Sequence, residues 1–474
     1  MSRSPNKTIL FTTFLGFILF IFNVSNAKTI NLEEAIKYAL DNNRDAKIAL
    51  MNVDKADAAI HEAYGYAYPN VDISANFAHF IEKPKMPFPD FEAMLTNATY
   101  EVLFNERVIP YDPSKFIPMN YKLQSFSLSN SYEAKAQFSQ ILFNNTVFNG
   151  IGASKKYYDL SVESLKSTIS KTINTVKKAF YGVLLTKSML EITSASFKNA
   201  QDNLSNVKAL LAQGLVSDYD AMQAEVQVEN IRPIVLQMEN TYKNTKDGLK
   251  IVLGINPNEE IELTGELEYN TEEVPQEQAS IDKAINKNFD LSTMKYKKDV
   301  DNAWIDFYRS DYWPSLAAFG NYSFNGNSDN FNFQHYRSSI VGVQLSMNIF
   351  KGFQTSNKVQ QSQIAYQQTE EQYSQLKDFT ISQVKAKILD LETVKNKINA
   401  QERNIQLAQK TYSIANLRYK DGTGNQLEVQ NADMALRQAR TNRLQSVFEY
   451  ISAKTDLEQL LGQVDKKYLD KYIK

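Results

Sequence analysis

The sequence predicts a mainly α-helical fold with four β-strands, organised as two similar halves. A glycine-centred segment at 214–224 recurs at 422–432, and a Leu-Gly pair at 253–254 recurs at 461–462 with the same offset (422 − 214 = 462 − 254 = 208). Long stretches carry an apolar residue at every seventh position, and shorter stretches before them alternate apolar and polar residues. These periods are typical of packed helices and of half-buried strands.

The seven-residue period predicts long helices. Its apolar row in the first half runs through Ile169, Val176, Val183, Leu190, Phe197, Leu204 and Leu211. A strict period of seven indicates helices that wrap around one another. We expect helical hairpins at about 153–253 and 356–461, with turns near 214–220 and 422–428, where glycines break the pattern. The helices alone do not exclude a free antiparallel coiled coil, as in a scaffold protein.

Alternating stretches predict strands at about 71–81, 125–141, 315–325 and 338–350. In the last of these, Val341, Val343 and Leu345 alternate with glycine, glutamine and serine, so the apolar side chains share one face. Four strands do not close a membrane barrel, because small barrels need about eight. Either the strands form a soluble sandwich, or several chains pool them. The length of the helices and the predicted signal peptide favour the second arrangement.

The N-terminus resembles a signal peptide. Basic Arg3 and Lys7 precede an apolar run at 9–24, and small residues at 25–27 suit a cleavage site. We therefore expect a signal peptide at 1–27 and a mature chain that begins near Lys28. An uncleaved anchor is the alternative.

Composition excludes several classes of function. The net charge of −2 offers no basic surface for nucleic acid, and the absence of cysteine excludes disulfides and thiolate chemistry. No phosphate-binding loop, zinc motif or serine nucleophile motif occurs, and the three histidines are scattered. We predict no enzymatic activity, no cofactor and no metal site.

The ordered elements resemble the TolC family of outer-membrane channels. The resemblance rests on the helix–strand–strand–helix order found twice, on the strand-to-helix junctions at 140–144 and 347–353, and on the turn sequence at 419–423. It implies a homotrimer in which three chains pool four strands each into a 12-stranded β-barrel, continued by a coiled-coil helical tunnel. It also implies the outer membrane of a Gram-negative bacterium, with its lipid as a partner.

The resemblance implies a division of the chain and a set of partners. The first repeat would span 28–254, an acidic connector 255–280, the second repeat 281–462 and a tail 463–474. A periplasmic adaptor (membrane fusion) protein and an inner-membrane transporter would supply the energy for export of small molecules. Protein secretion of type I is the alternative, and a periplasmic coiled-coil scaffold or adhesin is the third possibility.

The candidate site residues fall at the turns and on the strands. Asp220 and Glu428 match acidic positions of the family's entrance, beside Gly422 and Gly424, although the family can have a basic latch residue where Gly424 stands. Acids at a helix start are also ordinary. The candidate residues for the barrel lumen are Ser127, Ser129, Ser131, Glu133, Gln344 and Ser346. The outer loop at 82–122 is much longer than its counterpart at 326–337; it restricts a mouth, contacts partners or is a tolerated insertion.

Overall fold

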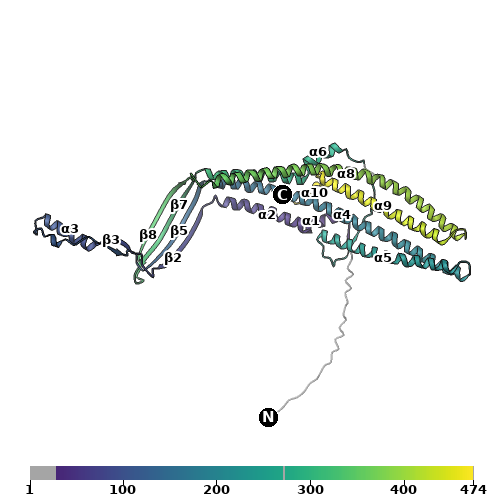
Figure 1. The fold of residues 1–474 in the computed structure, drawn as a ribbon, viewed down its shortest axis with the longest axis horizontal. Helices are drawn as coiled ribbons and strands as arrows, with labels where there is room; N and C mark the ends of the chain where they lie inside the picture. Colours follow the sequence, from purple (N-terminus) through teal and green to yellow (C-terminus); the bar gives the residue numbers. More distant parts are fainter. Residues whose placement is uncertain (1–27, 271–272, 473–474) are drawn as a thin grey trace, which may run out of the picture. The chain divides into compact units, whose positions relative to one another are not determined.

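The structure is a computed structural model that describes residues 28–270 and 273–472 (Figure 1). The predicted signal peptide lies outside the described residues. As predicted, the described chain is mainly helical with a few strands. It divides into two compact units, each treated by itself: a helical unit (Met1–Leu50, Leu165–Asp290, Lys377–Lys474) and a strand unit (Met51–Ser164, Leu291–Leu376).

Long helices in two consecutive pairs account for most of the chain. The first pair is α4 (Asn145–Ala212) and α5 (Asp218–Leu253), and the second is α8 (Gln354–Lys420) and α9 (Gln426–Leu460). The start of α4 lies before the expected position near residue 153. The Asn144 side chain explains this, because its oxygen accepts hydrogen bonds from the backbone N–H groups of Thr146 and Val147.

Shorter elements complete the chain. The shorter helices are α1 (Leu32–Asn42), α2 (Arg44–Gly65), α6 (Glu277–Lys287), α7 (Phe289–Arg309) and α10 (Lys466–Asp470), with short 3-10 turns at Pro113–Lys115 and Ser310–Tyr312. Two short strands, β1 (Lys28–Ile30) and β6 (Ile261–Leu263), form a parallel pair. The sequence analysis did not predict this pair, because strands of three residues are too short to show a period.

The core of the helical unit contains the predicted seven-residue row. Ile169, Val176 and Val183 are at most 1 % exposed, and Val384 and Ile398 are fully buried. Burial of each such side chain contributes about 1.5–3 kcal/mol. Nearer the turn the row is only half-buried, at Leu204 and Leu211. The helices are therefore held most firmly away from their turns.

One antiparallel sheet forms the centre of the strand unit, with the order β2-β5-β7-β8 (Figure 1). Its strands are β2 (Asn70–His79), β5 (Asn130–Phe143), β7 (Ser315–Ser328) and β8 (Gln334–Ser346). The register joins Val71 to Phe138, Phe138 to Gly320 and Gly320 to Val341. The apolar rows of all four strands therefore lie on one face and the polar rows on the other.

Two strands are displaced from their predicted bounds. β5 begins at Asn130 rather than at Ser125, because the backbone N–H and the hydroxyl of Ser129 bind the carboxylate of Asp329 in the β7–β8 turn. β8 ends at Ser346, before the predicted end at 350. The chain then turns at Gly352 and Phe353, both with positive φ, and enters α8.

The expected outer loop is a folded insert, which we define as residues 82–124. It contains β3 (Met86–Pro89), α3 (Phe91–Asn105) and β4 (Tyr121–Gln124), with β3 and β4 paired antiparallel. Asn97 of α3 exchanges two hydrogen bonds with the backbone of Ile117, each of 2.8 Å. The insert leaves the sheet after β2 and returns before β5, next to the terminal pair His79–Asn130.

Candidate functional site

The α4–α5 turn contains the first acidic candidate, Asp220. Gly214 adopts φ 71° after the helix, and Leu215 donates its N–H to the Leu210 carbonyl at 3.0 Å, which closes the end of α4. Ser217 then caps α5. The Asp220 carboxylate accepts hydrogen bonds from the N–H (3.1 Å) and the hydroxyl (2.6 Å) of Ser217. It is therefore part of a capping box within its own turn.

The α8–α9 turn contains the other candidates and has the same backbone bonds. Gly422 adopts φ 71°, and Thr423 donates its N–H to the Arg418 carbonyl at 2.9 Å. Asn425 caps α9 through the N–H of Glu428. The carboxylate of Glu428 lies 3.3 Å from the guanidinium of Arg418, with both side chains about half exposed. Arg418 was not among the candidates predicted from the sequence. The only signal for it there is its charge, which is opposite to that of Glu428.

Gly424 is held by close packing of its backbone. A Cβ atom at this position would lie 3.1–3.3 Å from Cβ and backbone atoms of Arg418 and Tyr419, in the last turn of α8. A larger residue would push this turn aside. This close packing favours glycine at the position where the TolC family can have a basic latch residue.

Side chains link the two turns to each other. Tyr419 of α8 packs against a small apolar cluster formed by Val207, Ala221 and Ala224 of α4 and α5. Its hydroxyl is buried without a hydrogen-bond partner, and burial, together with the charge of Asp220, raises the pKa of this phenol. The sequence analysis placed Tyr419 in the turn motif but did not predict this contact.

Two polar contacts near the turns also cross between the helix pairs. Gln430 of α9 donates to Gln227 of α5, and Ser196 of α4 donates to Asp433 of α9 at 2.6 Å. These contacts were missed because they join residues more than 200 positions apart in the chain. They hold the turn region by hydrogen bonds rather than by a large core.

The polar face of the sheet contains four of the six candidates for the lumen. Ser131, Glu133, Gln344 and Ser346 all lie on it by register. Its polar side chains pair across strands, as in Ser315–Ser346 and Ser323–Ser338, each at 2.7 Å. Ser127 and Ser129 lie before β5, so these two are not part of the strand.

The opposite face of the sheet is apolar and exposed. Ile73 is 83 % exposed, Val341 89 % and Leu345 70 %. Aromatic side chains gather at one end of this face, where Tyr132 contacts Phe333 with ring centroids 5.2 Å apart and Phe324 stacks on His335. Beyond the other end, Trp313 and Phe350 are 60 % and 69 % exposed. Monomeric soluble proteins seldom expose so large an apolar surface.

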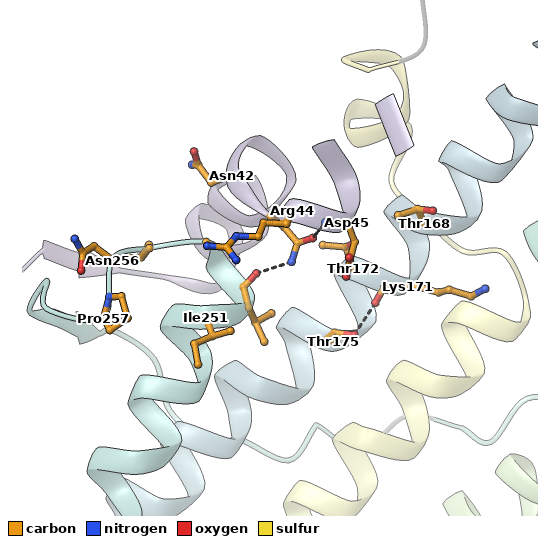
Figure 2. A pocket seen from close by; sticks show the side chains of 14 residues that line it. Asn42, Arg44, Asp45, Thr168, Lys171, Thr172, Thr175, Ile251, Asn256 and Pro257 are labelled. Atoms are coloured by element: carbon orange, nitrogen blue, oxygen red, sulfur yellow. Dashed lines mark hydrogen bonds between the residues drawn. The ribbon is translucent and has the colours of Figure 1, made fainter. Parts of the chain in front are cut away.

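We call the C-terminal end of the second helix of each pair, α5 or α9, the base of that pair. An asparagine and a glycine close each base. Figure 2 shows the surroundings of the first base, including Asn42, Arg44 and Ile251. Asn43 donates there to the Val252 carbonyl at 2.9 Å, two residues before Gly254. Gly254 has φ 72°, and a Cβ there would lie 2.5 Å from the Asn42 carbonyl oxygen. A surface cavity of about 1010 Å³ opens at this junction, lined in part by Arg44, Asp45 and three threonines of α4.

The second base repeats these contacts. Asn288 donates to the Leu460 carbonyl at 3.0 Å, and its side-chain oxygen accepts the N–H of Asp290, as the Asn43 oxygen accepts that of Asp45. Gly462 has φ 62°, and a Cβ there would lie 2.0 Å from the Lys287 carbonyl oxygen. At both bases only glycine allows this approach.

None of the helices in the described residues has an apolar stretch of the length that crossing a bilayer requires.

Comparisons with known proteins give a consistent result. Residues 119–254 and 280–463 match the family described as outer membrane efflux protein. The chain is 22 % identical to the outer membrane protein TolC of Vibrio cholerae over 72 % of its own length and 78 % of that protein. It is also 22 % identical to the alkaline protease secretion protein AprF of Pseudomonas aeruginosa, over 72 % of each. The fold matches the Campylobacter jejuni CmeC outer membrane channel with a TM-score of 0.71 and 15 % identity, over 100 % of this chain and 98 % of that one.

Proposed function

The chain belongs to the outer membrane efflux protein family and is an outer-membrane channel protein rather than an enzyme, and we propose that three copies form one export conduit. The observation that carries this proposal is a four-stranded sheet with an apolar face and two unpaired edges, β2 and β8. Unpaired backbone groups are very costly in lipid, so the sheet needs partners along both edges. Pairing β2 of one copy with β8 of the next gives a barrel of about 12 strands from three copies.

In this arrangement the apolar face meets lipid and the polar face lines the lumen. Ser131, Glu133, Gln344 and Ser346 would then face water. The aromatic residues at the two ends of the apolar face suit the two membrane–water interfaces. At about 1.5 Å per residue, α4 and α8 are each on the order of 100 Å long, which suits a tunnel that extends far from the membrane.

The two halves of the chain are copies of one repeat in this proposal, at 28–254 and 281–462. The paired bases support it, because Gly254 and Gly462 both have positive φ, and at each base an asparagine donates to the carbonyl two residues before the glycine, that of Val252 or Leu460. The segment between them is a connector, and residues 463–474 are a tail.

The conduit exports small molecules together with a periplasmic adaptor and an inner-membrane transporter. The chain has no phosphate-binding loop of its own, so the energy must come from a partner. Protein secretion is the second candidate, favoured by the similarity to a protease secretion protein. A strain that lacks the gene separates the two functions. Loss of growth on toxic small molecules would indicate export of small molecules, and loss of proteins from the medium would indicate protein secretion.

The helix turns form the entrance in this proposal, with Asp220 and Glu428 near the axis beside Gly422 and Gly424. Three copies of each carboxylate would attract cations. We expect divalent or trivalent cations added from the periplasmic side to block single channels in planar bilayers. The double variant Asp220→Ala with Glu428→Ala should lose the block and remain a trimer, and an unchanged block would place the cation site elsewhere.

Adjacent residues of β8 test the barrel. Val343 lies on the apolar face and is 65 % exposed, whereas Gln344 lies on the polar face. Val343→Arg should destabilise the trimer by about 2–4 kcal/mol if it lies near the bilayer midplane, and Gln344→Arg should have little effect. The measurement is the dissociation temperature of trimers extracted from outer membranes. Equal effects, or recovery of monomers alone from the unmodified protein, would contradict the proposal.

A further inference from the structure

The insert exposes a second apolar stripe on α3. One side of this helix faces the rest of the insert, through Asn97, Tyr100 and Phe104, whose partners are Ile117, Phe116 and Tyr111. On the opposite side, Phe91, Leu95, Ala98 and Val102 follow the spacing i, i+4, i+7, i+11 and are all exposed. Phe91 is 53 % exposed, Leu95 57 % and Val102 60 %.

The insert is well ordered by its own contacts, so this exposure is a feature of its folded form. Asp90 caps α3 and pairs with Lys122 of β4 at 2.5 Å. Lys83 pairs with Asp329 of the β7–β8 turn at 2.5 Å, which fastens the base of the insert to the sheet. An exposed apolar stripe on a helix whose other side is already packed is typical of an interaction surface.

We propose that the apolar stripe of α3 packs against the same stripe of the neighbouring copies. This inference rests on the trimer of the proposed function. The three inserts would then pack around the symmetry axis as a lid over the end of the barrel where β2 and β5 are joined. The insert begins directly after β2, an edge strand, and therefore lies at a boundary between copies when the barrel closes.

The exposed area is sufficient for such a contact. Three large stripe residues, Phe91, Leu95 and Val102, are more than half exposed, but alone they are smaller than a standard interface. The contact would therefore include the other exposed apolar residues of the insert, which are Met86, Val108, Met119, Tyr121 and Leu123. Together the eight leave roughly 800–1,000 Å² of surface, similar to the about 800 Å² that each partner contributes to a standard interface.

Charge favours a second copy over a lipid surface. The insert has six acidic and five basic residues, Glu82, Asp90, Glu92, Glu101, Glu106 and Asp112 against Lys83, Lys85, Arg107, Lys115 and Lys122. A net charge of −1 repels a second copy only weakly. Attraction to anionic headgroups would need an excess of basic residues.

Two neighbouring positions on α3 provide the test, in a chain without cysteine of its own. Leu95→Cys places a thiol in the stripe, and Thr96→Cys places one on an exposed position outside it. In outer membranes that contain the full-length protein, oxidation should convert most Leu95→Cys chains into disulfide-linked dimers and few Thr96→Cys chains. Replacing residues 82–124 by a short glycine linker should raise single-channel conductance while the trimer persists.

The outcomes separate this inference from the trimer itself. Intact trimers without Leu95→Cys dimers, and with unchanged conductance after removal of the insert, would overturn the lid and leave the trimer standing. Slow reaction of Leu95→Cys with water-soluble maleimide but no dimers would assign the stripe to lipid or to another protein, which also overturns it. If the unmodified protein is monomeric, the proposed function fails first.

Discussion

The two helix turns share a backbone and differ in their side chains. Both use a glycine at φ 71° and the same closing hydrogen bonds. Position 418 of the second turn corresponds to position 210 of the first (418 − 208 = 210). This position is arginine in the second turn and leucine in the first. Glu428 therefore has a cation beside it, whereas Asp220 binds the cap of its own helix. The first turn thus uses its acidic residue in a helix cap, and the second uses it in an exposed ion pair.

The two helix pairs also differ near their bases, and this difference can be measured. Asp456 of α9 pairs with Lys178 and lies 3.5 Å from Lys387 and 3.1 Å from the Asn174 amide. The corresponding position in α5 is Gly248 (456 − 208 = 248), with open space around it. Asp456 therefore links α9 by charge to α4 and α8, whereas Gly248 at the corresponding position of α5 has no side chain that could form such a link.

The largest effect is expected at the base glycines. Gly462→Ala should destabilise the protein by about 2–6 kcal/mol, because a strained backbone and overpacking act together. Gly254→Ala should cost less, since the contact it would create is longer. Gly248→Ala is the matched control and should stabilise α5 by about 0.5–1 kcal/mol. Denaturant titration measures all three, and a harmless Gly462→Ala would contradict the close approach of Gly462 to the Lys287 carbonyl.

Asp456→Asn should produce the next largest effect. Burial alone would raise the pKa of Asp456, but hydrogen bonds from Lys178 and Asn174 outweigh burial and lower it. A lowered folded-state pKa stabilises the protein above the unfolded value, and this contribution is lost as the pH falls through the folded value. The variant should lose about 1–2 kcal/mol at pH 7. Its deficit should shrink below about pH 4, near the ordinary pKa, and a deficit independent of pH would exclude the charge as its cause.

The helix caps should show a smaller difference. Ser217→Ala removes the bond that the hydroxyl accepts from the Asp220 N–H and the bond that it donates to the Asp220 carboxylate. Asn425→Ala removes the bond from the Glu428 N–H and a longer one, of 3.4 Å, to the Glu428 carboxylate. We expect losses of about 1–2 kcal/mol and about 1 kcal/mol respectively. Hydrogen exchange at the first turns of α5 and α9 would resolve them. Equal protection losses would remove this distinction between the turns.

The Arg418–Glu428 pair should have the smallest effect. Both side chains are about half exposed, so Arg418→Ala should cost about 0.2–1 kcal/mol and less at high salt. A double-mutant cycle with Glu428→Gln isolates the pair. A salt-independent coupling would show that packing, rather than charge, joins the two residues.

The sequence predicted what short-range patterns determine. The seven-residue row from Ile169 and the alternation around Val341 identified the long helices and the sheet strands, because each period reports a buried or shared face. Contacts between distant residues were not predictable in this way. The start of β5 depends on Asp329, 200 positions from Ser129, and the Gln227–Gln430 bond depends on how two hairpins pack. The sequence predicts a loop for the insert rather than a helix, because α3 is apolar on two sides and this hides its helical period.

In the proposed barrel, the edges of β2 and β8 also determine how the protein is made. A single chain would satisfy neither edge, so its folding in the membrane would wait for encounters with other copies and slow at low abundance. β2 of one copy would pair with β8 of the next. Such head-to-tail pairing forms a closed ring only if the sheet has the correct curvature. Strand twist supplies that curvature. A substitution that flattens the sheet would convert ring closure into open-ended polymerisation, so twist in these strands is a requirement of biogenesis as well as of shape.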